Sequence, residues 1–151
     1  SGMAYGDPNL IAKLMVAAAL GVNYDIPAKK DGHVCYARIY AEDPKMNPSY
    51  EGGVESISLP QTDENSFAKF AVKEGAQIRR MFNTQIGEIG VWAPSREEAI
   101  KKLEELLNET KVKGIKINIE NQLTLMSTDQ FQSGKFQTDT FEKEIYPQLV
   151  K

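Results

Sequence analysis

The chain has 151 residues, of which 41% are hydrophobic and 26% are charged, and its formal net charge is -3. A chain of this length can bury roughly 68–70% of the surface that its unfolded form exposes, so we expect one domain with a real hydrophobic core. The acidic balance argues against nucleic acid or anionic lipid as a partner. No apolar run approaches the ~20 residues that span a bilayer, so we expect no membrane partner and a cytoplasmic location.

Only one histidine and one cysteine are present, which excludes a His/Cys metal cage and most catalytic triads within the chain. The sequence therefore predicts no metal site. It also lacks a Gly-rich phosphate loop and the HExxH, CxxC and GxSxG motifs. Any chemistry must come from carboxylate, Arg, Lys or hydroxyl side chains, or be shared with segments outside this chain.

The N-terminal part predicts one helix and a linker. Residues 1–3, Ser-Gly-Met, have the character of a cloning remnant. Asp7-Pro8 predicts a helix start, and Gly21 predicts its end. The apolar residues between them fall at helical spacing, so this short amphipathic helix needs a surface to pack against. The polar stretch 22–32 contains Pro27 and predicts a boundary between this helix and the rest of the chain.

Alternation of apolar and polar residues predicts strands through the middle of the chain. The expected ranges are 33–41, 54–59, 68–72, 78–82 and 86–93. Turns are expected at Gly52-Gly53 and Glu74-Gly75, and short Gly turns between strands favour antiparallel pairing.

Helices are predicted after the strands. Ser95 and Glu98 have the spacing of a capping box, and an apolar stripe runs on through Leu107. Residues 115–117 are expected to be extended, Asn118 to cap a helix through Met126, and a last helix to span about 141–149. The predicted fold class is α+β, an antiparallel sheet of about five strands with helices packed on one side.

Arg38 is unusual among the charged residues of the predicted strands, because alternation places Tyr36 and Tyr40 on the same strand face. If that face met water, Arg38 would be an ordinary exposed charge. Its aromatic neighbours instead make a half-covered positive surface that suits a developing oxyanion or a carboxylate. The other candidates favour structural roles: His33 as a hydrogen-bonded histidine rather than a general base, and Cys35 as a buried thiol.

Several motifs occur in an order that resembles a known family. Residues 32–44, GHVCYARIYAEDP, resemble the GHAxExRxxAEDP signature of the C-terminal subdomain of biotin carboxylases. Residues 82–87 (FNTQIG) are similar to the family's Y-D-S-M-I-G, 95–100 (SREEAI) to N-R-x-x-A-I, 113–118 (KGIKIN) to D-G-I-K-T-N, and 131–134 (FQSG) to F-x-x-G. The first helix also resembles the one that precedes this subdomain in the family.

The resemblance implies that residues 4–31 are the helix and linker from the end of the preceding ATP-grasp region, and that 32–151 are the biotin carboxylase C-terminal subdomain. In the family, ATP, Mg²⁺ and bicarbonate are used to carboxylate N1 of a biotin held on a carrier domain. The implied partners are the remaining ATP-grasp domains, the biotin carboxyl carrier, the carboxyltransferase components and a second copy of the chain in a homodimer. Biotin, ATP and Mg²⁺ would serve the parent enzyme, and none is expected to bind this fragment.

The resemblance also implies roles for individual residues. Arg38 lies at the position of the arginine that steadies the enolate-like oxygen of biotin when N1 loses its proton, and Phe82 and Asn83 fall in the vicinity of biotin. Asn83 replaces the usual Asp, Tyr36 the usual Glu, and Glu88 a common Lys. Two interpretations stay open: a piece of an active biotin carboxylase, inactive alone, or a catalytically degenerate assembly or regulatory module on the same fold.

Overall fold

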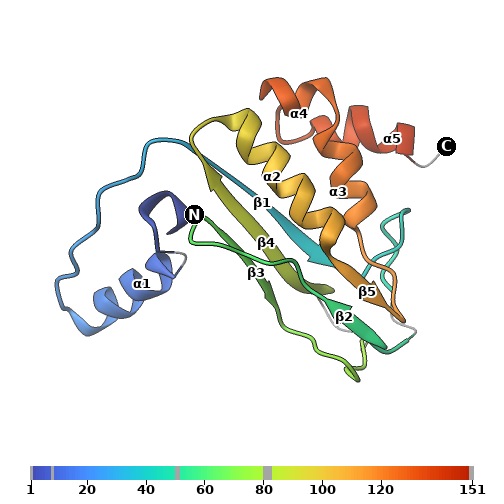
Figure 1. Cartoon of the computed structure of the whole chain (residues 1–151), viewed down its shortest axis with the longest axis horizontal. Coiled ribbons are helices and arrows are strands. Elements are labelled where there is room, and N and C mark those ends of the chain that lie inside the picture. The colour runs from blue at the N-terminus through green and yellow to red at the C-terminus, as the bar shows by residue number, and fades with distance from the viewer. Residues whose placement is uncertain (1, 8, 50–51, 80–82, 150–151) are drawn as a thin grey trace.

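The computed structural model describes residues 2–7, 9–49, 52–79 and 83–149, which form an α+β unit (Figure 1). Its main sheet has the antiparallel order β1-β4-β3, with β1 at His33–Tyr40, β4 at Gln85–Ala93 and β3 at Ser66–Phe70. A second antiparallel pair joins β2, Ser56–Ser58, to β5, Lys111–Lys113. The described strands therefore make two small sheets rather than one sheet of about five strands.

Helix α2, Arg96–Glu109, lies along one face of the main sheet across β1 and β4 (Figure 1). It begins as predicted, because the Ser95 side chain accepts from the Glu98 N–H and the Glu98 side chain accepts from the Ser95 N–H. The remaining C-terminal helices come after it on the same side of the sheet: α3 at Ile119–Met126, α4 at Asp129–Ser133, the π-helical turn η2 at Phe141–Ile145, and α5 at Tyr146–Leu149.

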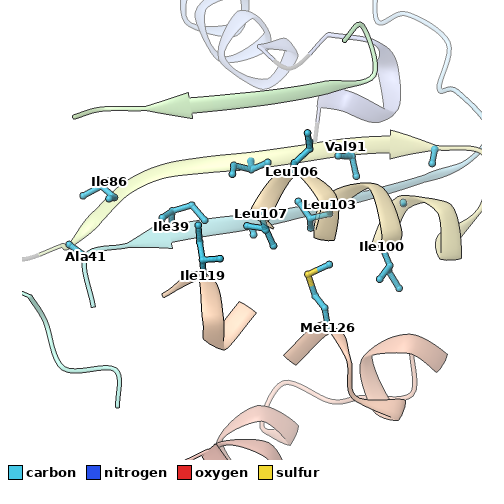
Figure 2. Close-up of a cluster of buried hydrophobic side chains, with 14 of the residues drawn as sticks. Ile39, Ala41, Ile86, Val91, Ile100, Leu103, Leu106, Leu107, Ile119 and Met126 are labelled. Atoms are coloured by element: carbon cyan, nitrogen blue, oxygen red, sulfur yellow. The ribbon is translucent and has the colours of Figure 1, made fainter. Parts of the chain in front are cut away.

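The hydrophobic core lies between α2, α3 and the inner face of the main sheet (Figure 2). Ile39 from β1 and Val91 from β4 meet Leu103 and Leu107 from α2, and each of these side chains is at most 1% exposed. Alternate residues of β1 enter this core, because Ala37 and Ile39 are buried whereas Tyr36 and Arg38 are exposed. The two faces of the strand predicted from the alternation are therefore confirmed.

The N-terminal helix stands apart from this core (Figure 1). Helix α1, Leu10–Leu20, ends at Gly21 in a left-handed conformation as predicted, and Asp7 accepts a hydrogen bond from the Asn9 N–H. Most of its apolar surface is uncovered: Met15 is 69% exposed and Leu20 is 70% exposed. The short 3-10 turn η1, Gly2–Tyr5, precedes it, and every residue of the linker 22–32 is exposed.

Three local features differ in detail from the sequence expectations. No strand forms over the described residues 77–79, where only an isolated bridge joins Gln77 to Gly53; the rest of the expected 78–82 strand lies outside the described residues. Strand β5 forms at 111–113, which was not predicted, and residues 115–117, which were expected to be extended, form no strand. Asn118 does precede α3, but its side chain caps no helix N–H.

None of the helices in the described part of the chain is long and apolar enough to cross a membrane.

Candidate functional site

The exposed face of the main sheet, opposite α2, carries the candidate site, which we call the outer face. Its centre is Arg38 on β1, with Tyr36 and Tyr40 on either side along the strand. Tyr36 is 49% exposed and Tyr40 is half-buried. A hydrogen bond with the Tyr40 side chain, and then the proximity of Tyr36, raise the pKa of the Arg38 guanidinium above its ordinary value. Arg38 therefore stays fully charged between the two tyrosines of its strand face.

The strand register places a row of charges across the outer face. Glu88 of β4 is the cross-strand partner of Arg38 on one side and of Lys69 on the other. Within the described residues, neither cation forms an ion pair with Glu88. Lys69 instead donates to the Asn9 side chain at 3.1 Å and lies 5.4 Å from the centre of the Phe67 ring. The charge of Arg38 is therefore available to an anion that approaches from outside the chain.

Asn83 lies close to the end of β1 that carries Arg38. The Ala41 N–H donates to the Thr84 carbonyl at 2.9 Å, so the segment before β4 runs beside the residues after Tyr40. The Asn83 side chain is exposed and accepts from the Gln85 N–H at 2.9 Å. It lines an open hollow of about 430 Å³ together with Lys69, Glu88 and neighbouring β3 and β4 residues. Phe82, the other residue predicted near biotin, lies outside the described residues.

The remaining sequence candidates lie away from this site or carry structural roles. His33 is exposed at the opposite end of β1 from Tyr40, and its ring has no hydrogen-bond partner within the described residues, so the predicted structural bond is not seen. Cys35 is half-buried, and burial raises the pKa of its thiol, in agreement with an inert side chain. Gly87 lies directly against the Phe70 ring, so the lack of a side chain at this position allows β3 and β4 to pack closely.

Sequence reasoning missed the residue that holds the backbone of this site. Asn118 is 6% exposed, and its side chain bonds to the backbone of Arg38 and Tyr40 rather than to its own helix. The one signal for it in the sequence is its place at the end of residues 113–118, which resemble the D-G-I-K-T-N motif.

A family model, the biotin carboxylase C-terminal domain, matches residues 36–143. The chain belongs to this family. It is 32% identical over 110 residues to the mouse (Mus musculus) methylcrotonoyl-CoA carboxylase subunit alpha, covering 72% of this chain and 15% of that protein. It is 31% identical over 117 residues to biotin carboxylase 2 of Bacillus subtilis, covering 78% of this chain and 26% of that protein.

A solved relative shows the same architecture. The biotin carboxylase domain of the Hydrogenobacter thermophilus 2-oxoglutarate carboxylase superposes with a TM-score of 0.84 and 26% identity, covering 99% of this chain and 33% of that one. That structure is a dimer in complex with magnesium ADP, ADP and bicarbonate. The α+β fold with helices on one side of an antiparallel sheet is thus that of biotin carboxylase domains, and this chain spans a third or less of each of these three relatives.

Proposed function

We propose that this chain is the C-terminal part of a biotin carboxylase and that it supplies Arg38 to the site where biotin is carboxylated. The observation that carries the proposal is the setting of Arg38. Its side chain is exposed on β1, and among the described residues it forms no ion pair with a carboxylate. A permanently charged donor in this setting fits a ligand oxygen that becomes negative during the reaction.

Four residues at the outer face have a part in the proposed mechanism. ATP and bicarbonate supply the activated carboxyl group, and biotin supplies the nitrogen that receives it. Arg38 would hold the negative charge that develops on the ureido oxygen as N1 gives its proton to a general base in the parent enzyme outside this chain. Tyr36 and Tyr40, which flank Arg38 on the same face of β1, would help to orient its guanidinium. Asn83, beside the same end of β1, would contact the biotin ring system as a neutral hydrogen-bonding group.

The uncovered surface of α1 supports the proposal that the chain is one part of a longer enzyme. Four apolar side chains of this helix, Ile11, Met15, Val16 and Leu20, are 55–70% exposed. Burying them would stabilise a contact by about 25 cal/mol for each Å² of apolar surface removed from water. We assign this surface to the preceding ATP-grasp region, so that residues 4–31 end that region and 32–151 form the C-terminal subdomain.

The proposal assigns the nucleotide and metal chemistry to other parts of the parent enzyme. No group of three or more His, Cys, Asp or Glu side chains that could hold a metal ion occurs among the described residues. We therefore expect ATP and Mg²⁺ to be bound mainly by the other ATP-grasp domains. The isolated chain is predicted to be folded and inactive, and nucleotide affinity or bicarbonate-dependent ATP cleavage by the purified 151-residue chain would overturn this prediction.

Further partners belong to the same proposal. The biotin carboxyl carrier would present biotin to the outer face, and the carboxyltransferase components would receive the product. A second copy of the chain is also a proposed partner, since the Hydrogenobacter thermophilus relative is a dimer. A cytoplasmic location remains a prediction from the composition.

Substitution of Arg38 in the full-length enzyme tests the proposal. Arg38→Ala should lower biotin carboxylation by about 100-fold or more while the affinity for ATP stays within about twofold. Arg79→Ala is the matched control, because Arg79 is also exposed but lies outside β1. An unchanged carboxylation rate in Arg38→Ala would return Arg38 to the role of an ordinary surface charge.

The second candidate function is an assembly or regulatory module that has lost catalysis. The observation that favours it is the exposed Asn83, since an amide there cannot ionise where the family usually has a carboxylate. Sedimentation of the chain together with carboxylation by the full-length enzyme separates the two functions. The module is supported if the chain forms a stable dimer and the full-length enzyme carries out no carboxylation. Carboxylation that depends on Arg38 excludes the module.

A further inference from the structure

The buried side-chain amide of Asn118 forms hydrogen bonds with the open backbone edge of β1 beside Arg38. Strand β1 is an outer strand in the order β1-β4-β3, so one side of its backbone has no neighbouring strand in that sheet. The Asn118 side chain lies on this side: its Oδ1 accepts from the Tyr40 N–H at 2.9 Å, and its Nδ2 donates to the Arg38 carbonyl at 3.2 Å. The Asn118 backbone N–H donates to the Tyr40 carbonyl at 3.1 Å.

These three bonds hold the backbone on both sides of Ile39, as a neighbouring strand would. Only a side chain with both a donor and an acceptor can serve the Arg38 carbonyl and the Tyr40 N–H together, and Asn has this pair at the required short reach. Asn118 is only 6% exposed, so its amide would be costly to bury without these partners. Gln122, one turn further along α3, adds a weaker contact to the Arg38 carbonyl at 3.4 Å.

Asn118 is itself firmly placed. The next residue, Ile119, is 8% exposed and belongs to the hydrophobic core that α3 shares with the sheet (Figure 2). The Asn118 carbonyl accepts from the Gln122 N–H at 3.1 Å in the first turn of α3. The position of the Arg38 backbone is therefore coupled to the packing of α3 and not only to its own sheet.

We propose that Asn118 is a positioning residue for Arg38, fixing the strand backbone so that the guanidinium meets the reacting oxygen of biotin. The proposal rests on the function proposed above for Arg38. A displacement of about 1 Å at a reacting centre can cost on the order of 100-fold in rate, so loss of the Asn118 bonds lowers turnover even when the domain stays folded. Asn118 would act through the backbone of Arg38 and Tyr40, to which its side chain bonds, and not by contact with biotin.

Backbone amide exchange in the 151-residue chain provides the first measurement. In Asn118→Ala we expect exchange of the Tyr40 amide to quicken by about 10-fold or more relative to the Ile89 amide in the central strand. Asn121→Ala is the matched control, because Asn121 lies on the same helix and donates instead to the Pro44 carbonyl at 3.1 Å. Equal acceleration at Tyr40 and Ile89 would mean that Asn118 stabilises the fold generally, and would overturn the proposal.

A double-mutant cycle with Arg38 in the full-length enzyme gives the second measurement. Asn118→Ala should lower carboxylation turnover by about 10-fold or more with little change in the KM for ATP, but by less than about twofold when Arg38→Ala is already present. A merely structural residue would lower the rate by the same factor in both backgrounds. If Asn118→Ala does not fold, Asn118→Asp keeps the acceptor for the Tyr40 N–H and removes the donor to the Arg38 carbonyl.

The outcomes separate this proposal from the one on which it rests. If Arg38→Ala alone leaves carboxylation unchanged, the function proposed for Arg38 fails. Arg38→Ala can instead lower carboxylation severely while Asn118→Ala lowers the rate by the same factor with and without Arg38→Ala. In that case Arg38 keeps its role and the positioning role of Asn118 is wrong.

Discussion

The division of the chain into a packed domain and an unpacked helix is tested by two substitutions of the same residue type. Leu103 lies in the middle of α2 at 1% exposure, within the core against the sheet, whereas Leu20 ends α1 at 70% exposure. We expect Leu103→Ala to destabilise the isolated chain strongly and Leu20→Ala to leave its stability nearly unchanged.

The expected magnitudes depend on burial. Truncating a buried leucine removes its transfer free energy and leaves a cavity, so Leu103→Ala should cost roughly 2–5 kcal/mol of unfolding free energy. For a domain of about 150 residues, each kcal/mol corresponds to roughly 2–4 °C, so the melting temperature should fall by about 4–20 °C. Leu20→Ala removes contacts that barely exist in this chain, and its cost should stay within about 0.5 kcal/mol.

Urea unfolding monitored by tryptophan fluorescence measures both variants. Trp92 is the one tryptophan of the chain and lies half-buried on β4, so its emission reports on the main sheet directly. Similar losses of stability in the two variants would refute the reasoning, because they would show that α1 shares the core. A loss in Leu20→Ala that occurs only in the full-length enzyme would instead agree with α1 packing on the preceding region.

Three further predictions concern local interactions, each measured by the same urea unfolding. Ser95→Ala removes the cap of α2 and should cost about 1 kcal/mol; an unchanged midpoint would contradict the cap. Hydrogen bonds from Lys102, 2.6 Å away, and then from Ser66 lower the pKa of Asp63 to about 2. Asp63→Asn should therefore cost under about 1 kcal/mol at pH 7 and much less at pH 2; an equal cost at both would contradict the ion pair. Gly87→Ala places a methyl 2.6 Å from Phe70 and should cost roughly 1–3 kcal/mol; no cost would mean that β3 shifts freely.

The pH dependence expected at Asp63 takes its sign from the direction of the pKa shift. The ordinary carboxyl pKa of 3.8 applies to the unfolded chain, and the lower folded value means that the native state favours the ionised form. The stabilisation is therefore fully present above about pH 4 and is lost as the pH falls from about 4 through about 2. The Asp63 side chain is 55% exposed, so salt should weaken the effect.

The elements predicted well from the sequence are those governed by local physics. The cap at Ser95 and the apolar stripe of α2 depend on residues within one helix, and the alternation of β1 is a property of eight consecutive residues. Arg38 could be identified as a candidate for the same reason, because alternation alone places it on the face opposite the core.

The features that escaped prediction depend on contacts between distant residues. Which strands pair is decided by the whole fold, so the separation of β2 and β5 from the main sheet has no local signal. Asn118 precedes an apolar helical run and so has the pattern of a helix cap, but its side chain bonds to Tyr40, 78 residues earlier in the chain. Sequence pattern alone therefore predicted a helix cap, whereas the bond to a residue distant in sequence gives Asn118 its place beside Arg38.

The central claim, that Arg38 stabilises charge on biotin, is tested most directly by ATP cleavage in the full-length enzyme with and without free biotin. If Arg38 acts only on the biotin oxygen, Arg38→Ala should abolish the stimulation of bicarbonate-dependent ATP cleavage by biotin and leave the slower cleavage without biotin within about twofold of its original rate. Stimulation by biotin that survives in Arg38→Ala, or an equal fall in both rates, would contradict the account.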